Sequence, residues 1–513
     1  MCGFAGFIES STLTGADPRS VLDAMVASIE HRGPDDHGTW VDEDAGVHLG
    51  FRRLSIQDLS PMGHQPMVSA SQRWIVTFNG EIYNFGELRE ELRKSGTTFR
   101  GGSDTEVLLA AVERWGVRET LPRLRGMFAF ALWDRKEREL WLARDRMGIK
   151  PLYIAAHPTG VVFGSELRAL LLHPRVERRG DPRAARQFLR TLYVPAPMAI
   201  IEGVEKLRPG HVARFALTGG GGMDRSEEAW WDLDRVAHVD KRTDLSGAEA
   251  VDELHALLRD SVRLRLVADV PVGALLSGGV DSSLVVALMA EQSPTPVRTF
   301  TVRFDDPRFD EGPIAREVAS ILGAEHTEVE LPTDVVRDLV PSLPDFSDEP
   351  MGNPSILPTL LVSQVARRDV TVALSGDGGD ELFGGYNRYL RAPSLVRAVG
   401  RIPGSLSGAV AAALRGTSRL PGLDGLGKLG AAAGLGGQHR LTDRLARLAG
   451  AVDEEGAAGV YEGLMAVGLS DPPLREGLET GGFAPPRHDA DRESLLAFMM
   501  REDQARYLPD DLL

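Results

Sequence analysis

The chain has 513 residues, of which 42% are apolar and 26% charged, and its formal net charge is −16. This length predicts about two to four domains, because a single hydrophobic core rarely organises so long a chain. The acidic balance argues against a nucleic-acid partner or an anionic membrane surface, because both require a positive field on the protein.

Cysteine content and the first residues indicate the compartment. Cys2 is the single cysteine, so no intrachain disulfide can form, which is typical of a reducing cytoplasm. The N-terminus MCGFAGFIES lacks the basic start and long apolar core of a secretory signal. The sequence contains no uninterrupted apolar run of about 18 residues, so we predict no membrane span. We therefore expect a cytoplasmic enzyme.

Residues 1–215 are predicted to form a first domain of short strands and a few helices. Apolar periodicity and capping residues support this reading. We expect a strand over 74–79 that ends in a turn GEIYN, helices over 85–95 and 104–115, a hairpin of 127–134 with 139–145, and a strand in GVVFGSE at 160–166.

Residues 216–246 are Gly-rich and then acidic and aromatic, and we predict a linker there. Strands and helices then alternate through 247–513, which predicts a parallel sheet with helices on both faces. Right-handed crossovers would place every loop after a strand along one edge of that sheet. Gly425, Gly427 and Gly430 have the G-x-G-x-x-G spacing, but no strand precedes them, so we expect no nucleotide binding there.

The position of Cys2 gives it chemical significance. Because residue 2 is small, we expect the initiator Met1 to be removed, which leaves Cys2 with a thiol and a free α-amine. An amine with an ordinary pKa of about 8 can accept the proton of the thiol near neutral pH. A buried, inert cysteine is the alternative reading.

Other residues of the first domain could complete a site for a free amino acid. Arg53 can pair with a carboxylate in bidentate fashion. Asn79 and Gly80 offer a side-chain amide and an unhindered backbone N–H for an oxyanion. Glu81 and Asp104 could receive an α-ammonium group. Taken singly, Asn79–Gly80 could be only a turn and Asp104 only a helix cap.

Seven segments of this domain resemble the glutaminase domain of glutamine-hydrolysing asparagine synthetase, and they occur in the family's order. They are MCGFAGF, HRGPDDHG at 31–38, RRLSI at 52–56, NGEIYN at 79–84, SDTEVLL at 103–109, RGMFAFALWD at 125–134 and ARDRMGIKPLY at 143–153. The resemblance implies an N-terminal-nucleophile hydrolase fold, an αββα sandwich. It also implies Cys2 as nucleophile, Asn79 and Gly80 as oxyanion hole, and glutamine binding by Arg53, Glu81 and Asp104.

The segment SGGVDSS at 277–283 lies between an apolar strand and an apolar helix. Small residues there let backbone N–H groups point into one concavity at a helix N-terminus, which favours a phosphate. The Lys of a Walker A loop is missing. The alternative is a capped helix after a Gly turn. A second loop, SGDGGDELFGGY at 375–386, also follows a strand, so Asp281 and Asp380 could jointly hold Mg²⁺.

Both loops, with TFTVRF at 299–304 and FDE at 309–311, resemble the ATP-pyrophosphatase (PP-loop) synthetase domain of the same family. We thus expect an α/β fold whose N-terminal part is α+β. The resemblance implies ATP contacts by Leu275, Ser277, Gly278, Gly279, Asp281, Ser282, Val302, Ser375, Gly376 and Asp377, and Mg²⁺ contacts by Asp281 and Asp380. Many family members carry Glu in place of Asp377.

The two halves together predict glutamine-dependent, ATP-driven amidation of a carboxylate. Aspartate is the expected acceptor, with asparagine, AMP, pyrophosphate and glutamate as products, and SDEPMGNPSILPTLL at 347–361 is the expected acceptor wall. Another acid of cell-wall or natural-product biosynthesis, a glutaminase-only protein and a non-catalytic relative are the alternatives. The chain ends at ARYLPDDLL, where family members continue, so we expect a C-terminally short synthetase half. A homodimer is compatible with the resemblance.

Overall fold

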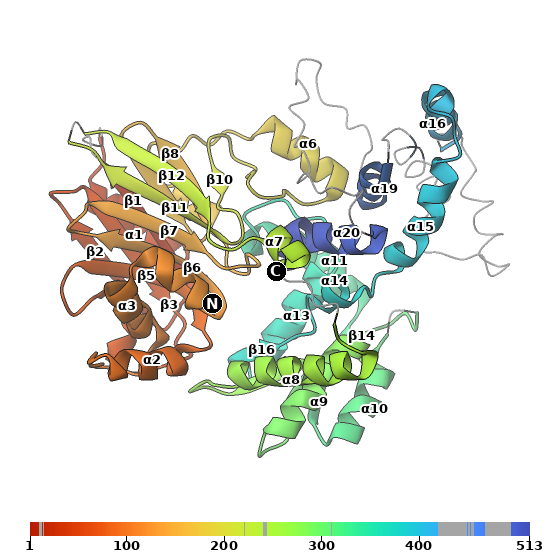
Figure 1. The fold of residues 1–513 in the computed structure, drawn as a ribbon, viewed down its shortest axis with the longest axis horizontal. Coiled ribbons are helices and arrows are strands. Elements are labelled where there is room, and N and C mark those ends of the chain that lie inside the picture. Colours follow the sequence, from red (N-terminus) through yellow and green to blue (C-terminus); the bar gives the residue numbers. More distant parts are fainter. Residues whose placement is uncertain are drawn as a thin grey trace.

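The fold comes from a computed structural model of the chain. It describes residues 1–9, 13, 15–219, 221–239, 244–308, 310–418, 449, 452, 456–466 and 494–513. Figure 1 shows the first half of the chain as a body of stacked sheets, beside which the second half forms helices around a smaller sheet. The Gly425–Gly430 spacing and Phe309 of the FDE segment lie outside the described residues.

Two antiparallel six-stranded sheets form the centre of the first half. The first sheet, in the order β10-β8-β9-β1-β3-β2, contains β1 (Gly3–Glu9), β2 (Asp36–Asp42), β3 (Val47–Arg53), β8 (Tyr153–His157), β9 (Gly160–Gly164) and β10 (Glu205–Lys206). The second, in the order β12-β11-β7-β6-β5-β4, contains β4 (Met67–Val68), β5 (Trp74–Ile82), β6 (Gly126–Asp134), β7 (Glu139–Arg144), β11 (His211–Leu217) and β12 (Met223–Ala229).

Alternating side chains explain why the sheets stack. On β1, Phe4 and Ile8 pack between the two sheets, whereas Ala5 and Phe7 face α1 (Pro18–Ser28) and α5 (Leu167–Leu170). On the second sheet, Ile75 joins the inner layer, and its neighbours on β5 pack against α2 (Phe85–Lys94) and α3 (Asp104–Trp115). The predicted αββα sandwich is therefore confirmed.

The predicted helices and the β6–β7 hairpin of this half are confirmed, but two segments differ from expectation. The turn expected at GEIYN begins later, because β5 runs on to Ile82 and pairs with β6 through Gly80 and Ile82. The predicted linker 216–246 contains β12, which pairs along its whole length with β11, and α7 (Leu233–Val239). Cross-strand pairing stabilises the end of β5 and the whole of β12, although the local sequence of each segment does not favour a strand.

A four-stranded parallel sheet in the order β15-β14-β13-β16 forms the centre of the second half, as expected. Its strands are β13 (Val272–Leu275), β14 (Arg298–Phe304), β15 (Glu325–Leu331) and β16 (Val372–Leu374). The helices are α8 (Gly247–Arg265), α9 (Val280–Gln292), α10 (Gly312–Leu322), α11 (Thr333–Leu339), α12 (Leu343–Phe346), α13 (Ile356–Ala366), α14 (Gly379–Phe383), α15 (Asn387–Val399), α16 (Gly404–Ser418), α19 (Gly456–Met465) and α20 (Leu495–Glu502).

The last described segment joins the two halves. A π-helical stretch, η5 (Asp503–Leu512), continues α20 and contacts α14. Asp503 is fully buried, and its carboxylate accepts hydrogen bonds from Arg388, Tyr389 and Tyr461. Asp510 accepts from the backbone N–H of Ala196 in the first half at 2.8 Å. This segment is therefore a structural contact between the halves.

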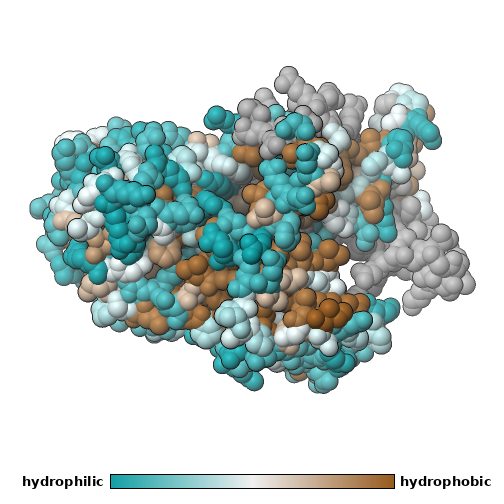
Figure 2. Space-filling model, turned by 60° about the horizontal axis from the view of Figure 1, so that its bottom comes forward, coloured by the Kyte–Doolittle hydropathy of each residue, from teal (hydrophilic) through white to brown (hydrophobic). Residues whose placement is uncertain are grey.

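Apolar side chains are exposed on the second half. They include Val251 and Leu257 of α8, Val280 of α9, and Ile314 and Ile321 of α10. Figure 2 turns the bottom of Figure 1, where these helices lie, toward the viewer and shows apolar surface gathered there. The second half thus covers its apolar residues less completely than the first, in which three large clusters are closed between layers.

Candidate active sites

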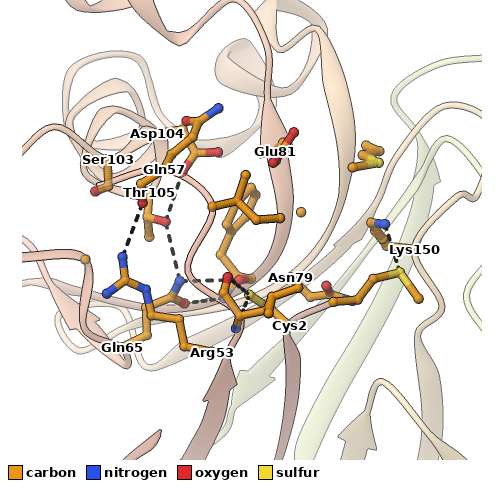
Figure 3. A pocket seen from close by; sticks show the side chains of 17 residues that line it. Cys2, Arg53, Gln57, Gln65, Asn79, Glu81, Ser103, Asp104, Thr105 and Lys150 are labelled. Carbon is orange, nitrogen blue, oxygen red and sulfur yellow. Dashed lines mark hydrogen bonds between the residues drawn. The ribbon is translucent and has the colours of Figure 1, made fainter. Parts of the chain in front are cut away.

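Cys2 lies immediately before β1, at the edge of a pocket in the first half (Figure 3). The backbone N–H of Leu54 donates to its Sγ at 3.4 Å, and the Arg32 Nε donates to its carbonyl oxygen at 2.8 Å. These contacts fix the backbone and the thiol of Cys2 against two separate segments. The pocket has a volume of about 70 Å³.

Asn79 and Gly80 lie inside β5 and line the same pocket as Cys2. The Asn79 side chain is 1% exposed, and its Nδ2 has no hydrogen-bond partner among the described residues. A buried amide donor without a partner is costly, so this N–H is available to an oxygen that enters the pocket. A Cβ at position 80 would lie 2.2 Å from the Met127 carbonyl oxygen, which explains the glycine.

Arg53 ends β3, and its buried guanidinium lines the pocket. Its Nη1 donates to the Ser60 carbonyl at 3.2 Å, and its Nη2 donates to the carbonyls of Gln57, at 3.2 Å, and Asp58. A Cβ at Gly63 would lie 1.9 Å from Nη2, so only glycine leaves room for this group. The cation is therefore held in one orientation by neutral acceptors and keeps its charge for an anion.

Two carboxylates lie on the other wall. Glu81 is on β5, and Asp104 begins α3 and accepts the backbone N–H of Ile82 at 2.9 Å. Burial, followed by repulsion from Asp104, raises the pKa of Glu81 to about 7, and burial raises the pKa of Asp104 to about 6. A bound cation would relieve both effects, so this wall is suited to an ammonium group.

The groups around the thiol are largely desolvated. Burial raises the pKa of the Cys2 thiol and lowers the pKa of the α-amino group of Met1 to about 5. An amine with so low a pKa is neutral at pH 7. Burial also lowers the pKa of Lys150 to about 8, and its Nζ donates to the Met1 Sδ at 3.3 Å.

The second candidate site lies where β13 and β16 end side by side. Ser277, Gly278 and Gly279 follow β13, and the Gly279 N–H and the Ser282 hydroxyl bond Ser277 Oγ at 3.2 and 2.9 Å. Gly278 has a φ of +79°, which a side chain would strain. Leu275 and Val302, on adjacent strands, pack against one apolar cluster. These hydrogen bonds lie within the loop, and Gly279, the N-cap of α9, has no side-chain capping bond such as the capped-helix alternative predicts.

Ser375, Gly376 and Asp377 follow β16, and the Ser375 hydroxyl donates to Asp377 at 2.7 Å. This second loop packs on the first, since a Cβ at Gly376 would lie 2.8 Å from the Ser282 N–H nitrogen. Burial, followed by repulsion from Asp281, raises the pKa of Asp380. The loop that carries Asp380 therefore packs against Asp281, since a Cβ at Gly379 would lie 2.4 Å from the Asp281 Cγ.

This pair fits Mg²⁺ bound partly by phosphates. The described residues contain no group of three or more His, Cys, Asp or Glu side chains that could hold a metal ion. Mg²⁺ commonly takes one or two protein carboxylates and completes its shell with phosphate oxygens and water. Two carboxylates on adjacent loops would meet that requirement.

Family models match both halves of the chain. The glutamine amidotransferase domain model matches residues 1–231, and the asparagine synthase model matches residues 253–513. The chain belongs to the glutamine-hydrolysing asparagine synthetase family.

Known proteins of similar sequence include members of this family. A Bacillus subtilis protein named asparagine synthetase [glutamine-hydrolyzing] 1 is 38% identical over 79% of this chain and 62% of its own length. A putative asparagine synthetase 2 of Methanocaldococcus jannaschii is 33% identical over 78% of this chain and 80% of its own. Amidase chry2 of Gibberella zeae is 32% identical over 77% of this chain and 60% of its own length. The chain spans about three fifths of the first relative's length.

In this member of the asparagine synthetase family, a chain of ion pairs joins the first site to the second half. Arg32, which bonds Cys2, pairs with Glu166 at 2.8 Å, and Glu166 pairs with Arg168 at 3.0 Å. Arg168 then pairs with Asp348 of the second half at 2.6 Å. A cavity of about 210 Å³ between the halves is lined by Arg32, Glu166 and Asp348. Nearby, Lys206 pairs with Glu349 at 2.6 Å.

Sequence reasoning missed Gln57 and Lys150, which line the glutaminase-like pocket (Figure 3). Lys150 belongs to the segment ARDRMGIKPLY, which was recognised as a motif, but none of its side chains was predicted to line the site. Gln57 directly follows RRLSI and has no signal of its own. Within the described part of the chain, no helix has the length and apolar character needed to cross a membrane.

Proposed function

We propose that the protein hydrolyses glutamine at Cys2 and uses the ammonia to convert aspartate to asparagine, with ATP split to AMP and pyrophosphate. One observation carries the proposal: the Cys2 thiol shares a pocket with the Asn79 Nδ2, which no described residue binds, the oriented Arg53 cation and the desolvated carboxylates of Glu81 and Asp104. These groups complement the carboxamide, α-carboxylate and α-ammonium of glutamine.

The glutaminase step begins with the thiol. Cleavage after Met1 would give Cys2 the α-amine, whose neutral form would accept the thiol proton. The sulfur attacks the glutamine carboxamide carbon, and Asn79 Nδ2 and the Gly80 N–H stabilise the oxyanion. The α-ammonium returns the proton to the leaving nitrogen, so ammonia departs as the thioester forms, and water then hydrolyses the thioester to glutamate and restores the thiol. A free thiol of this kind needs a reducing compartment, so we propose the cytoplasm.

The synthetase step would occur where β13 and β16 end. The loop 277–279 and the N-terminus of α9 would hold the polyphosphate of ATP, and Leu275 and Val302 would lie near the adenine. Mg²⁺ held by Asp281 and Asp380 would neutralise phosphate charge. The β-carboxylate of aspartate attacks the α-phosphorus and releases pyrophosphate, and ammonia then displaces AMP from the acyl-adenylate.

The cavity between the halves supports direct transfer of ammonia. It is lined by Arg32, which contacts Cys2, and by Asp348 and Glu349 of the segment expected to form the acceptor wall. Ammonia released into water would be protonated and lose its nucleophilicity. An enclosed route would avoid that loss.

The test is one incubation with glutamine, ATP, Mg²⁺ and aspartate, in which glutamate, asparagine and pyrophosphate are measured together. We expect all three in equal amounts, and a Cys2→Ala protein should lose glutamate release but still make asparagine from added ammonia. Glutamate release that is unchanged in Cys2→Ala would contradict the glutaminase assignment. Pyrophosphate absent with aspartate, but formed with another acid, would favour a different acceptor, as the similarity to amidase chry2 also allows.

A further inference from the structure

Gln57 has a side-chain amide whose donor and acceptor are not paired within the described part of the chain. The side chain lines the pocket that holds Cys2, and both its Nε2 and its Oε1 are buried without a hydrogen-bond partner among the described residues. Figure 3 draws it near Asp104 and Ser103 and away from Lys150. Leaving both a donor and an acceptor unpaired is costly, so the arrangement favours a ligand that carries one of each.

The backbone around Gln57 is fixed from both sides. Its carbonyl accepts from Arg53 Nη2 at 3.2 Å. The preceding Ile56 carbonyl accepts from the Asp269 N–H at 3.0 Å, and the following Asp58 N–H donates to the Asp269 carboxylate at 2.8 Å. Asp269 follows α8 and thus belongs to the second half of the chain. The backbone that carries the side chain is therefore held at three consecutive residues, which places Gln57 at the wall of the pocket.

The chemistry of the neighbours indicates what the amide contacts. Arg53 supplies a cation on one side, and Asp104 and Glu81 supply carboxylates on the other. We propose that Gln57 recognises the zwitterionic end of the substrate: Nε2 donates to the α-carboxylate beside Arg53, and Oε1 accepts from the α-ammonium beside Asp104. A neutral amide serves both groups without changing the net charge of the pocket. This inference rests on the proposed glutaminase function.

Affinity provides the first test. Calorimetry in the Cys2→Ala background measures glutamine binding without turnover, with Gln57→Met compared with Gln57 itself. Hydrogen bonds to charged groups are strong, so Gln57→Met should weaken binding about tenfold to hundredfold. In the protein that retains Cys2, the same substitution should raise KM and leave kcat within about threefold, because the reacting carboxamide is untouched. Gln72→Met is the matched control, since Gln72 is exposed and lies outside this pocket.

Substrate analogues provide the second test. Glutaramate is glutamine without its α-amino group, so it cannot use Oε1 of Gln57. The preference for glutamine over glutaramate, measured as a ratio of kcat/KM values, should fall about tenfold in Gln57→Met. Gln57→Glu keeps an acceptor but loses the donor and adds a charge, so it should bind glutamine more weakly and yet keep that preference.

The outcomes separate this inference from the proposed function. A folded Gln57→Met protein with unchanged affinity and unchanged preference would refute the role of Gln57 while glutamine hydrolysis at Cys2 stands. Glutamate release that does not depend on Cys2 would refute both. Weaker binding with an unchanged preference for glutamine over glutaramate in Gln57→Met would refute the contact with the α-ammonium.

Discussion

Asn79 and Asn84 have the same side chain, but one amide is fully bonded within the fold and the other is not. The Asn84 amide donates to the Arg123 carbonyl at 3.0 Å and accepts the Arg125 N–H at 2.8 Å. The Asn79 Nδ2 has no partner among the described residues and faces the thiol pocket. One asparagine therefore holds the fold together, and the other is available to a substrate.

The first prediction uses this contrast. Asn79→Ala should lower kcat for glutamine hydrolysis by about 10²–10³ with little change in KM, because the lost donor acts on the oxyanion. Its melting temperature should change less than that of Asn84→Ala, which breaks two buried hydrogen bonds. Steady-state kinetics and thermal unfolding of both variants check this. The reverse pattern, with the lower kcat in Asn84→Ala and the lower melting temperature in Asn79→Ala, would contradict both assignments.

The second prediction concerns pH. The pKa values of Glu81 and Asp104 in the free protein are about 7 and 6, so both carboxylates gain protons as pH falls toward 6. A protonated pair attracts the α-ammonium less, so kcat/KM for glutamine should fall on the acid side with apparent pKa values of the pair near 6–7. A profile over about pH 5 to about pH 9 measures this. An acid limb near the ordinary carboxylate value of about 4 would contradict it.

At the scale of elements, the adjacent ends of two parallel strands position the loops of the second candidate site. β13 and β16 pair in parallel, so the loops that follow them lie at one edge of the sheet. Glycines let those loops approach closely: a Cβ at Gly379 would lie 2.4 Å from the Asp281 Cγ. The position of the Asp281 carboxylate therefore depends on a residue almost a hundred positions later in the chain.

The third prediction follows from that contact. Gly379→Ala should displace the Asp281 carboxylate and lower ATP-dependent pyrophosphate release by about tenfold or more, while glutamine hydrolysis continues unchanged. Gly247→Ala is the control, because a Cβ there meets nothing within 4 Å. Separate assays of pyrophosphate and glutamate distinguish the two sites. Equal loss of both activities would show instead that the substitution disturbs the whole protein.

At the scale of the whole molecule, the two halves meet through buried charge. The ion pairs from Arg32 through Glu166 and Arg168 reach Asp348, and Arg168 also donates to the Asp345 carbonyl at 3.1 Å. These contacts border the cavity between the halves, so they would help to close any route for ammonia. They also tie the backbone of Cys2 to the segment expected to hold the acceptor.

The fourth prediction tests this closure. Arg168→Met should open the contact and let ammonia escape, so that asparagine formed per glutamate falls about twofold or more while glutamate release persists. Arg183→Met is a suitable control, because Arg183 is exposed and pairs locally with Asp181. Product ratios from one incubation are sufficient. An unchanged ratio in Arg168→Met would show that these ion pairs do not confine ammonia.

From the sequence alone, the alternation of strands and helices predicted the parallel sheet, and the ordered motifs, through their resemblance to a known family, implied the sandwich and several pocket residues, because such patterns are local properties of the chain. Cys2, Arg53, Asn79, Glu81 and Asp104 were named from such signals and do line one pocket. Their catalytic and binding roles, and the domain limits at 215 and 247, stay predictions. So do the homodimer and the aspartate acceptor.

Only the tertiary structure decided which polar groups lack partners and which segments are paired. β12 is a strand because β11 offers it a complete set of backbone partners, although its own sequence is charged. Gln57 belongs to the pocket because Asp269, which is distant in sequence, and the nearby Arg53 hold the backbone around it while nothing described binds its amide. Hydrogen-bond satisfaction depends on every neighbour in space, and a local sequence pattern contains only the neighbours along the chain.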